Sequence, residues 1–208
     1  MTERLFKVLI IGDATVGKTS FVQRYVNDSY RREYKTTIGV DFALKVIQIS
    51  DSETVRLQLW DIAGQERFSS MTRVYYKDAA ACVIMFDITG KKTFQNITKW
   101  KRDLDSKVSL PDGQPVPCLL IANKSDLPDR PVSEDEIEQL AKDSDFIGWT
   151  EMSVKDGTNV QEAMKFLLDE ILASNRMNAN SLDERGETGG HIKVKNDQDK
   201  IEVKSCSC

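Results

Sequence analysis

The stretch "GDATVGKTS" at residues 12–20 is the feature that most limits what this chain can fold into. It follows an apolar run at 5–11 that is typical of a buried strand, and it leads into a helical pattern at 18–27. Two glycines spaced by four residues and followed by lysine and threonine match the phosphate-binding loop, which requires this strand-then-helix order. The sequence therefore predicts a nucleotide-phosphate site, but the loop alone does not separate ATP from GTP.

Each residue type in this loop has a chemical reason to be there. Glycines permit tight backbone turns that aim several N–H groups at one anion, and the start of the following helix adds its dipole. Lys18 is expected to reach the β and γ phosphates, while Thr19 offers a hydroxyl to Mg²⁺. The predicted nucleotide contacts of the loop are Asp13, Ala14, Thr15, Val16, Gly17, Lys18, Thr19 and Ser20.

Strand and helix patterns alternate along the chain. Strands are predicted at 5–11, 40–49, 55–60, 80–87, 116–122 and 146–152, and helices at 18–27, 67–77, 93–107, 134–143 and 159–173. This alternation predicts an α/β fold, a six-stranded mostly parallel sheet with helices on both faces. The second and third strands are joined by a short polar turn, which predicts one antiparallel edge strand.

The length of 208 residues suits one domain and a tail. Residues 1–174 are predicted to form a nucleotide-binding domain, and the polar stretch 175–208 is predicted to be a flexible tail because it has too few large apolar residues to fold alone. A short strand or helix formed there on binding a partner is the alternative.

Composition narrows the function classes. A net charge of −4 argues against a nucleic-acid partner, and no apolar run is long enough to span a bilayer. The start carries neither a signal peptide nor a myristoylation glycine, so we expect the protein to be cytosolic at synthesis. The one histidine, His191, lies in the tail, which leaves no material for a histidine triad or metal cluster. Cys82 and Cys118 lie in strand patterns and are expected to pack as small hydrophobes.

The base-reading residues are predicted much further along the chain. "NKSD" at residues 123–126 follows a buried strand, which puts it at the sheet edge where nucleotides bind in open α/β folds. There the Asp126 carboxylate can accept from guanine N1–H and the exocyclic amino group, whereas adenine has no matching donors. "MSVK" also follows a strand, so Ser153, Val154 and Lys155 are expected to cover the base from the other side.

Together these motifs resemble a Ras-superfamily small GTPase, and within it the Rab family. The resemblance covers residues 5–174 and rests on five ordered motifs, which are "GDATVGKT", "TTIGVDF", "WDIAGQERF", "NKSD" and "MSVK". Similarity to Rab proteins in particular is carried by "IGVDF", "RLQLW", "RFSSMTRVYY" and the cysteine-ending tail.

The resemblance implies roles for residues around the phosphates. Thr37 would give Mg²⁺ a second protein hydroxyl and bond the γ-phosphate, and Asp61 would hold Mg²⁺ through water. The Gly64 N–H would sense the γ-phosphate. Gln65 would orient the attacking water, with Lys18 as the other catalytic residue.

The guanine contacts implied by the resemblance come from "NKSD" and from the segment that would be the first switch, residues 30–42. Asn123 belongs to this motif, and the stem of Lys124 would sandwich the base with Tyr30. Tyr34 could close over the phosphates. For Tyr30 alone, a surface aromatic in a loop is an equal alternative.

Two departures from the family pattern bear on activity and location. Ala14 and Thr15 stand where Ras has two glycines, which leaves the hydrolysis rate open. Ile62 replaces the usual threonine, and with "MTRVYYKDA" and "SLPDGQPVP" it resembles the Rab subgroup of lysosome-related organelles and phagosomes. A nucleotide-locked interaction module with little turnover stays an alternative, whereas a metabolic phosphotransferase would need an acceptor domain and a lid.

The end of the chain, "CSC", resembles the Rab ending that receives two geranylgeranyl chains on Cys206 and Cys208. Implied partners are effectors at the switches, an exchange factor, a GTPase-activating protein and a prenyl-binding carrier. The implied location is the cytoplasmic face of an endosomal, lysosome-related or phagosomal membrane, cycling with the cytosol. The effectors would meet a hydrophobic face of Ile38, Val40, Phe42, Trp60, Phe68 and Tyr75, some of which would be core residues in a plainer interpretation.

Overall fold

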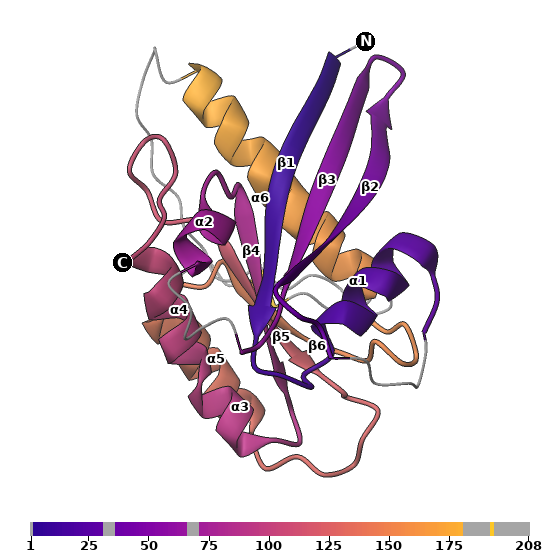
Figure 1. Ribbon diagram of the computed structural model, residues 1–208, viewed down its shortest axis with the longest axis vertical. Helices are drawn as coiled ribbons and strands as arrows, with labels where there is room; N and C mark the ends of the chain where they lie inside the picture. Colours follow the sequence, from indigo (N-terminus) through magenta and orange to yellow (C-terminus); the bar gives the residue numbers. More distant parts are fainter. Residues whose placement is uncertain (1, 31–35, 66–70, 181–191, 194–208) are drawn as a thin grey trace.

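A computed structural model describes residues 2–30, 36–65, 71–180 and 192–193 of the chain. The strands within these ranges form one sheet in the order β2-β3-β1-β4-β5-β6-β7 (Figure 1). Their bounds are β1 Thr2–Gly12, β2 Val40–Ser50, β3 Glu53–Ile62, β4 Ala81–Asp87, β5 Cys118–Asn123, β6 Gly148–Met152 and β7 Ile192–Lys193. The described helices are α1 Lys18–Asn27, α2 Thr72–Tyr76, α3 Lys91–Gln95, α4 Ile97–Asp105, α5 Glu134–Asp143 and α6 Val160–Asn180.

The sheet has the predicted mixed character. β2 pairs antiparallel with β3 at one edge, and every other neighbouring pair of these strands is parallel. The mostly parallel small G-protein fold is therefore confirmed for six strands. The short β7, which pairs with β6 through Ile192 and Lys193, is an addition within the segment predicted as a tail.

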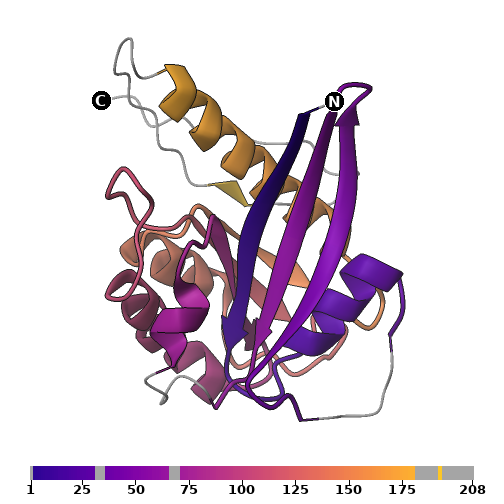
Figure 2. The same cartoon turned by 45° about the horizontal axis from the view of Figure 1, so that its top comes forward.

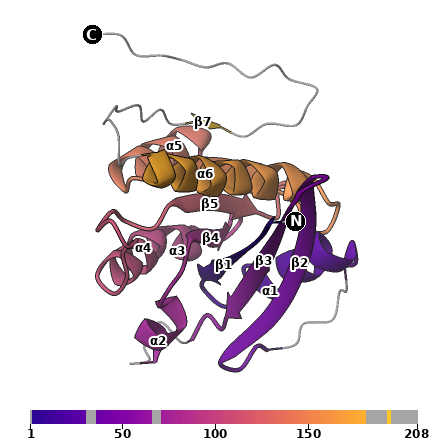
Figure 3. The ribbon, with the colours of Figure 1, turned by 90° about the horizontal axis from the view of Figure 1, so that it is seen from above.

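Apolar side chains on the two faces of the sheet make two cores. Alternate residues of the central strands pack on α1 and α6 on one face, where Val8 and Ile10 of β1 share a core with Leu167 of α6. Their neighbours pack on α2 to α5 on the other face, where Leu9 and Trp100 lie. Figure 3 shows α6 along one side of the sheet and α2 and α4 on the other. The helices thus cover both faces, as alternation of strands and helices predicts.

Several element boundaries differ from those predicted. The helix expected at 93–107 is divided into α3 and α4 at Asn96. Of the helix expected at 67–77, the described part is α2, and residues 66–70 lie outside the described residues. α6 continues past residue 174 to Asn180, beyond the predicted end of the domain.

The antiparallel pair also extends further than predicted. β1, β3 and β2 reach beyond the other strands as a ribbon, with α6 crossing one side of it (Figure 2).

Cys82 and Cys118 are paired positions of β4 and β5 and are fully buried, which confirms that they pack. None of the helices within the described ranges is long and apolar enough to cross a membrane.

Candidate nucleotide site

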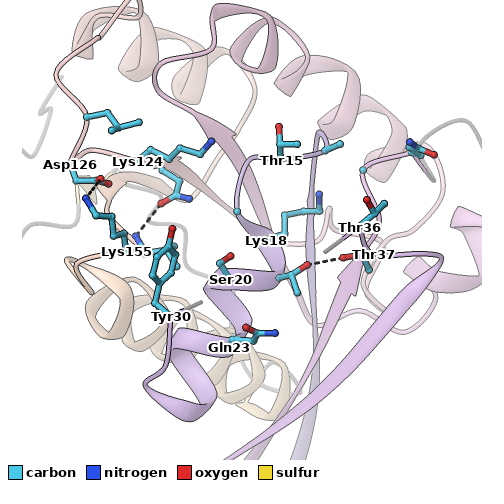
Figure 4. Close-up of a pocket in the computed structure, with 18 residues that line it drawn as sticks. Thr15, Lys18, Ser20, Gln23, Tyr30, Thr36, Thr37, Lys124, Asp126 and Lys155 are labelled. Atoms are coloured by element: carbon cyan, nitrogen blue, oxygen red, sulfur yellow. Dashed lines mark hydrogen bonds and ion pairs between the residues drawn. The ribbon is translucent and has the colours of Figure 1, made fainter. Parts of the chain in front are cut away.

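A pocket of about 460 Å³ lies where the loops following β1, β5 and β6 meet the segments 36–37 and 64–65 (Figure 4). This is the carboxyl edge of the parallel strands, where open α/β sheets bind ligands, and its volume is in the range of small-molecule sites. Its lining residues are Ala14, Thr15, Gly17, Lys18, Thr19, Ser20, Gln23, Tyr30, Thr36, Thr37, Gly64, Gln65, Asn123, Lys124, Asp126, Leu127, Val154 and Lys155.

The loop between β1 and α1 is closely packed around Lys18. Gly17 has a φ of 102°, and a Cβ there would lie 2.4 Å from Asn123 Nδ2, so no larger residue fits. Lys18 Nζ donates to the carbonyls of Gly12 at 2.9 Å and Asp13 at 2.8 Å. Burial lowers the pKa of Lys18 to about 8, an effect that the nearby Asp61 and Asp13 carboxylates oppose. The loop therefore presents a buried cation held by its own backbone.

Three oxygen-bearing side chains meet beside Lys18. Thr19 Oγ1 donates to Asp61 Oδ2 at 2.5 Å, and it lies 2.8 Å from Thr37 Oγ1. Because a hydroxyl has one proton, Thr37 must donate to Thr19 in this chain of bonds. Burial raises the pKa of Asp61, although the bond from Thr19 and the charge of Lys18 lower it.

This cluster fits Mg²⁺. Asp61 Oδ1 is buried and has no hydrogen-bond partner among the described residues, which leaves a carboxylate oxygen unsatisfied. A buried carboxylate oxygen without a partner is costly unless a cation or donor approaches it. Mg²⁺ prefers oxygen ligands and commonly combines one or two carboxylates with waters and substrate phosphates. Asp61 and the hydroxyls of Thr19 and Thr37 supply such a set.

The opposite end of the pocket is built around Asp126. Its carboxylate accepts from Ser153 Oγ at 2.9 Å and from Lys155 Nζ at 3.0 Å. Burial raises the pKa of Asp126, but the bonds from Lys155 and Ser153 outweigh it and hold the pKa below its usual value. The carboxylate is therefore ionised and acceptor-only at neutral pH, as the predicted pairing with guanine requires.

Asn123 joins three loops behind the pocket. Its Nδ2 donates to the Val16 carbonyl at 2.8 Å, and its Oδ1 accepts from the Val154 N–H at 3.2 Å. Lys124 has a φ of 70°, and its Nζ donates to Asp87 Oδ2 at 2.6 Å. The phosphate loop after β1 and the loops after β5 and β6, which carry the predicted base contacts, are thus fixed relative to one another.

Most of the predicted site residues line the pocket. Asp13, Val16, Asp61 and Ser153 do not, because they lie behind it: Val16 is buried, and Ser153 and Asp61 bond to lining residues. The Asp13 side chain turns away and accepts from Asn96 and Trp100. Tyr34, Phe68, Cys206 and Cys208 lie outside the described residues. The roles predicted for these residues remain predictions.

Sequence reasoning missed four residues of the site. Gln23, Thr36 and Leu127 line the pocket. Gln23 lies one helical turn after Ser20, and Leu127 follows Asp126, so spacing within known motifs could have indicated both. Arg24 donates hydrogen bonds to the loop after β6, through the carbonyls of Val154 at 3.0 Å and Lys155 at 2.5 Å. This contact spans 130 residues, and no local sequence pattern predicts it.

Beside the pocket, β2 and β3 carry an aromatic face. Phe42 and Trp60 make an edge-on contact with ring centroids 4.5 Å apart, and Lys7 Nζ lies 3.4 Å from the centroid of the Trp60 ring. Ile38 is 90% exposed and Phe42 52%, whereas Val40, Trp60 and Tyr75 are partly buried against the core. Ile38 and Phe42 are therefore free to form the predicted hydrophobic face, whereas Val40, Trp60 and Tyr75 belong partly to the core.

Comparison with known proteins agrees with this geometry. A sequence model of the Ras family matches residues 7–173. Rab-7L1 of Mus musculus is 61% identical over 184 residues, covering 88% of this chain and 90% of that protein. Rab-32 of Homo sapiens is 48% identical over 206 residues (99% and 89%), and Rab-32A of Dictyostelium discoideum is 50% identical over 173 residues (82% and 79%).

This sheet, with a pocket at the carboxyl edge of its parallel strands, has the fold of a small GTPase, and the chain belongs to the Ras family. It is an enzyme that hydrolyses GTP to GDP and phosphate. Its relatives carry Rab names, so the resemblance to the Rab family, and to the subgroup that includes Rab-32, is confirmed.

Proposed function

We propose that this protein is a membrane-anchored switch for vesicle traffic that hydrolyses GTP slowly and recruits effectors while GTP is bound. The observation that carries this proposal is the bonded series Thr37, Thr19, Asp61. It brings a residue of the segment before β2 into contact with the phosphate loop and with the end of β3. A change at the phosphates is then transmitted to two segments that reach the surface, an order–disorder mechanism known for such switches.

Thr19, Thr37 and Asp61 would hold Mg²⁺, with Asp61 acting through water. When bound, the ion would supply positive charge that offsets the negative charge of the phosphates. Thr37 can bond the γ-phosphate only while that group is present, so GTP hydrolysis removes one partner of the segment around Thr37.

The chain's own residues would divide the remaining work. Lys18 binds the β and γ phosphates, the Gly64 N–H contacts the γ-phosphate, and Gln65, which lines the pocket, orients the attacking water. Asp126 selects guanine. Intrinsic turnover is expected to be slow, since an arginine from a partner typically adds about 10³ to 10⁵ in rate in this class.

The output would be binding by partners. The exposed Ile38 and Phe42 beside Trp60 offer an apolar face next to the segment that ends in Thr37. Effectors would bind this face in the GTP state, an exchange factor would open the pocket, and a GTPase-activating protein would complete it. The Rab-7L1 and Rab-32 relatives support a place among endomembranes, and the Rab-32 subgroup favours lysosome-related, endosomal or phagosomal membranes.

Membrane attachment would depend on two geranylgeranyl chains at Cys206 and Cys208. Two chains anchor stably where one chain is marginal, at about 0.8 kcal/mol per buried CH₂. A soluble prenyl-binding carrier would shield both chains and allow the protein to cycle through the cytosol.

Phosphate release from pre-bound GTP in a single turnover distinguishes a slow GTPase from a nucleotide-locked module with little turnover. Ala14, which stands in place of a glycine, favours the locked module. We expect slow release in the parent and none above background in Gln65→Leu. The Thr37→Ala variant should still bind GDP, but effectors should bind its GTP-bound and GDP-bound forms equally. A parent that releases no phosphate even with an activating protein would favour the locked module.

Nucleotide selectivity is tested by competition. GDP and GTP should displace a fluorescent GDP analogue at far lower concentration than ADP and ATP, because adenine offers the Asp126 carboxylate no donors, and losing such hydrogen bonds to a charged group costs on the order of 1 to 3 kcal/mol. Equal competition by ATP would contradict the assignment of Asp126.

A further inference from the structure

The side chain of Asp13 lies outside the pocket although its backbone belongs to the phosphate loop. Asn96 Nδ2 donates to Asp13 Oδ2 at 2.6 Å, and Trp100 Nε1 donates to Oδ1 at 2.8 Å. Trp100 is fully buried and Asn96 is 8% exposed, so both donors are fixed by packing. The loop is therefore tied to the α3–α4 pair by two charge-assisted hydrogen bonds, which are stronger than neutral ones.

The backbone of Asp13 faces the reacting groups. Its carbonyl accepts from Lys18 Nζ at 2.8 Å. A Cβ on Gly64 would lie 2.5 Å from the Asp13 carbonyl carbon and 2.2 Å from the Ala14 nitrogen, so Gly64 packs directly on this peptide. One residue thus contacts the phosphate-binding lysine and the segment predicted to sense the γ-phosphate, while its side chain is held elsewhere.

The two donors come from the junction of α3 and α4, which supplies Asn96, and from α4 itself, which supplies Trp100. Asn96 lies between α3 and α4, and it caps neither with its side chain, so its amide is available for Asp13. Asn96 Oδ1 also accepts from Lys99 Nζ at 3.0 Å, which fixes the orientation of the amide. A carboxylate pointing into a phosphate site would repel the ligand, and these contacts hold it away.

We propose that Asp13 is a positioning residue for GTP hydrolysis, which through its bonds to Asn96 and Trp100 sets the position of the loop against Lys18 and Gly64. Without this tie the loop can shift relative to both. Nucleotide then leaves faster and hydrolysis slows, while guanine selectivity is retained because Asp126 lies at the other end of the pocket.

An exchange of the two partners tests the proposal. Asp13→Asn has one amide oxygen for two donors, so its nitrogen opposes either the Asn96 amide or the Trp100 N–H, and turning the Asn96 amide would set its nitrogen against the Lys99 ammonium. Asn96→Asp places a second carboxylate against that of Asp13, and the two repel each other. The double variant restores one donor and one acceptor with the roles reversed, so a double-mutant cycle isolates this contact.

Two rates are measured on the full chain, namely release of a fluorescent GDP analogue and single-turnover phosphate release from bound GTP. Each single variant should release GDP about 10-fold faster and hydrolyse GTP about 10-fold more slowly, the effect of losing one hydrogen bond to a charged group. The double variant should return to within about 3-fold of the parent on the same scale. Unchanged rates in the single variants, or no recovery in the double variant, would overturn the proposal.

A second pair of variants separates positioning from stability. Trp100→Phe keeps an aromatic ring in the core but removes the N–H together with some ring volume, so it also decides the proposal if Asp13→Asn does not fold. Trp149→Phe, in β6, makes the same change at a buried site away from the loop. Both should lower the unfolding temperature, but only Trp100→Phe should slow the hydrolysis of bound GTP. Equal hydrolysis rates in the two variants would reduce Asp13 to a purely structural role.

Discussion

At the scale of single residues, Lys18 combines two demands that oppose each other. It must be buried to exclude water from the phosphates, and it must be charged to bind them. Burial lowers its pKa from the ordinary 10.5 to about 8. In the nucleotide-free protein the folded state therefore loses this proton first as the pH rises. Between about 8 and 10.5 the unfolded state holds the extra proton, so this group increases the stability of the nucleotide-free fold with pH over that window.

Phosphate binding should respond to pH in the opposite direction. Because nucleotide binds charged Lys18, which has a pKa of about 8, we expect GDP affinity to fall by about 5-fold between pH 8 and pH 9 as the charged fraction drops. Titration calorimetry at pH 7, 8 and 9 measures this. Lys18→Arg stays charged throughout, so its affinity, whatever its absolute value, should not follow the same slope. A parent whose affinity is as flat as that of the arginine variant would contradict the shifted pKa.

Gly64 gives a second prediction at this scale. A Cβ added there would meet the Ala14 nitrogen at 2.2 Å, a contact with backbone that no side-chain movement relieves. Gly64→Ala should therefore keep GDP binding, since the base end of the pocket is unaffected, while single-turnover hydrolysis falls by at least about 10-fold, the effect of about 1.4 kcal/mol in the barrier. Gly113→Ala serves as a control, because open space surrounds that glycine, although its φ of 83° adds local strain. Normal hydrolysis in Gly64→Ala would show that the close approach is not used in the reaction.

At the scale of elements, the contact of α1 with the loop after β6 has the clearest effect on the site. Arg24 extends from α1 to the carbonyls of Val154 and Lys155, two residues that line the base end of the pocket. The phosphate loop begins the same helix. One helix therefore fixes the distance between the two ends of the pocket.

Replacing this arginine should loosen the base end. Arg24→Met keeps most of the apolar stem but loses both hydrogen bonds to the loop after β6, along with the exposed, longer contacts to Asp28. GDP release should accelerate about 10-fold, at a net 0.5 to 1.5 kcal/mol per bond to the loop. Stopped-flow release of a fluorescent analogue gives the rate. Arg56→Met changes an arginine on β3 that pairs with Glu3 instead, and it should release GDP at the parent rate. Equal rates in both variants would mean that Arg24 does not support the loop.

The elements also show what the sequence could and could not predict. Strands β1, β4 and β5 were predictable because buried parallel strands are nearly continuous apolar runs. Asp126 was predictable because "NKSD" follows such a run. The break at Asn96 was not, because no proline or glycine marks it, and neither was the bond of Asn96 to a carboxylate 83 residues earlier in the chain. The orientation of Asp13 was hidden for the same reason, since long-range partners leave no local pattern.

At the scale of the whole molecule, all of the pocket's lining residues lie between Ala14 and Lys155. The tail therefore contributes nothing to the pocket among the described residues. A chain ended after Asn180 should bind GDP as tightly as the full chain, with the same unfolding temperature to within a few degrees. Calorimetry on the two chains checks this, and a weaker affinity in the shorter chain would show that the tail supports the pocket.

The proposed anchor is tested separately. Cys206→Ser with Cys208→Ser should leave GDP binding intact and move the protein from membranes to the cytosol, and each single replacement should give intermediate attachment, since one chain binds reversibly. Fractionation of cells expressing the four versions measures the distribution. A double variant that stays on membranes as well as the parent would mean that something other than prenylation holds it.

The course of α6 has a geometric consequence for such a protein. The helix begins soon after Lys155, a pocket residue, and its 21 residues carry the chain about 30 Å away along the sheet (Figure 1). The helix therefore separates the nucleotide pocket from the start of the tail, whose end carries the proposed lipid anchor. In the anchored state proposed above, this length would separate the pocket from the lipid headgroups, and exchange and hydrolysis would not require the protein to leave the bilayer.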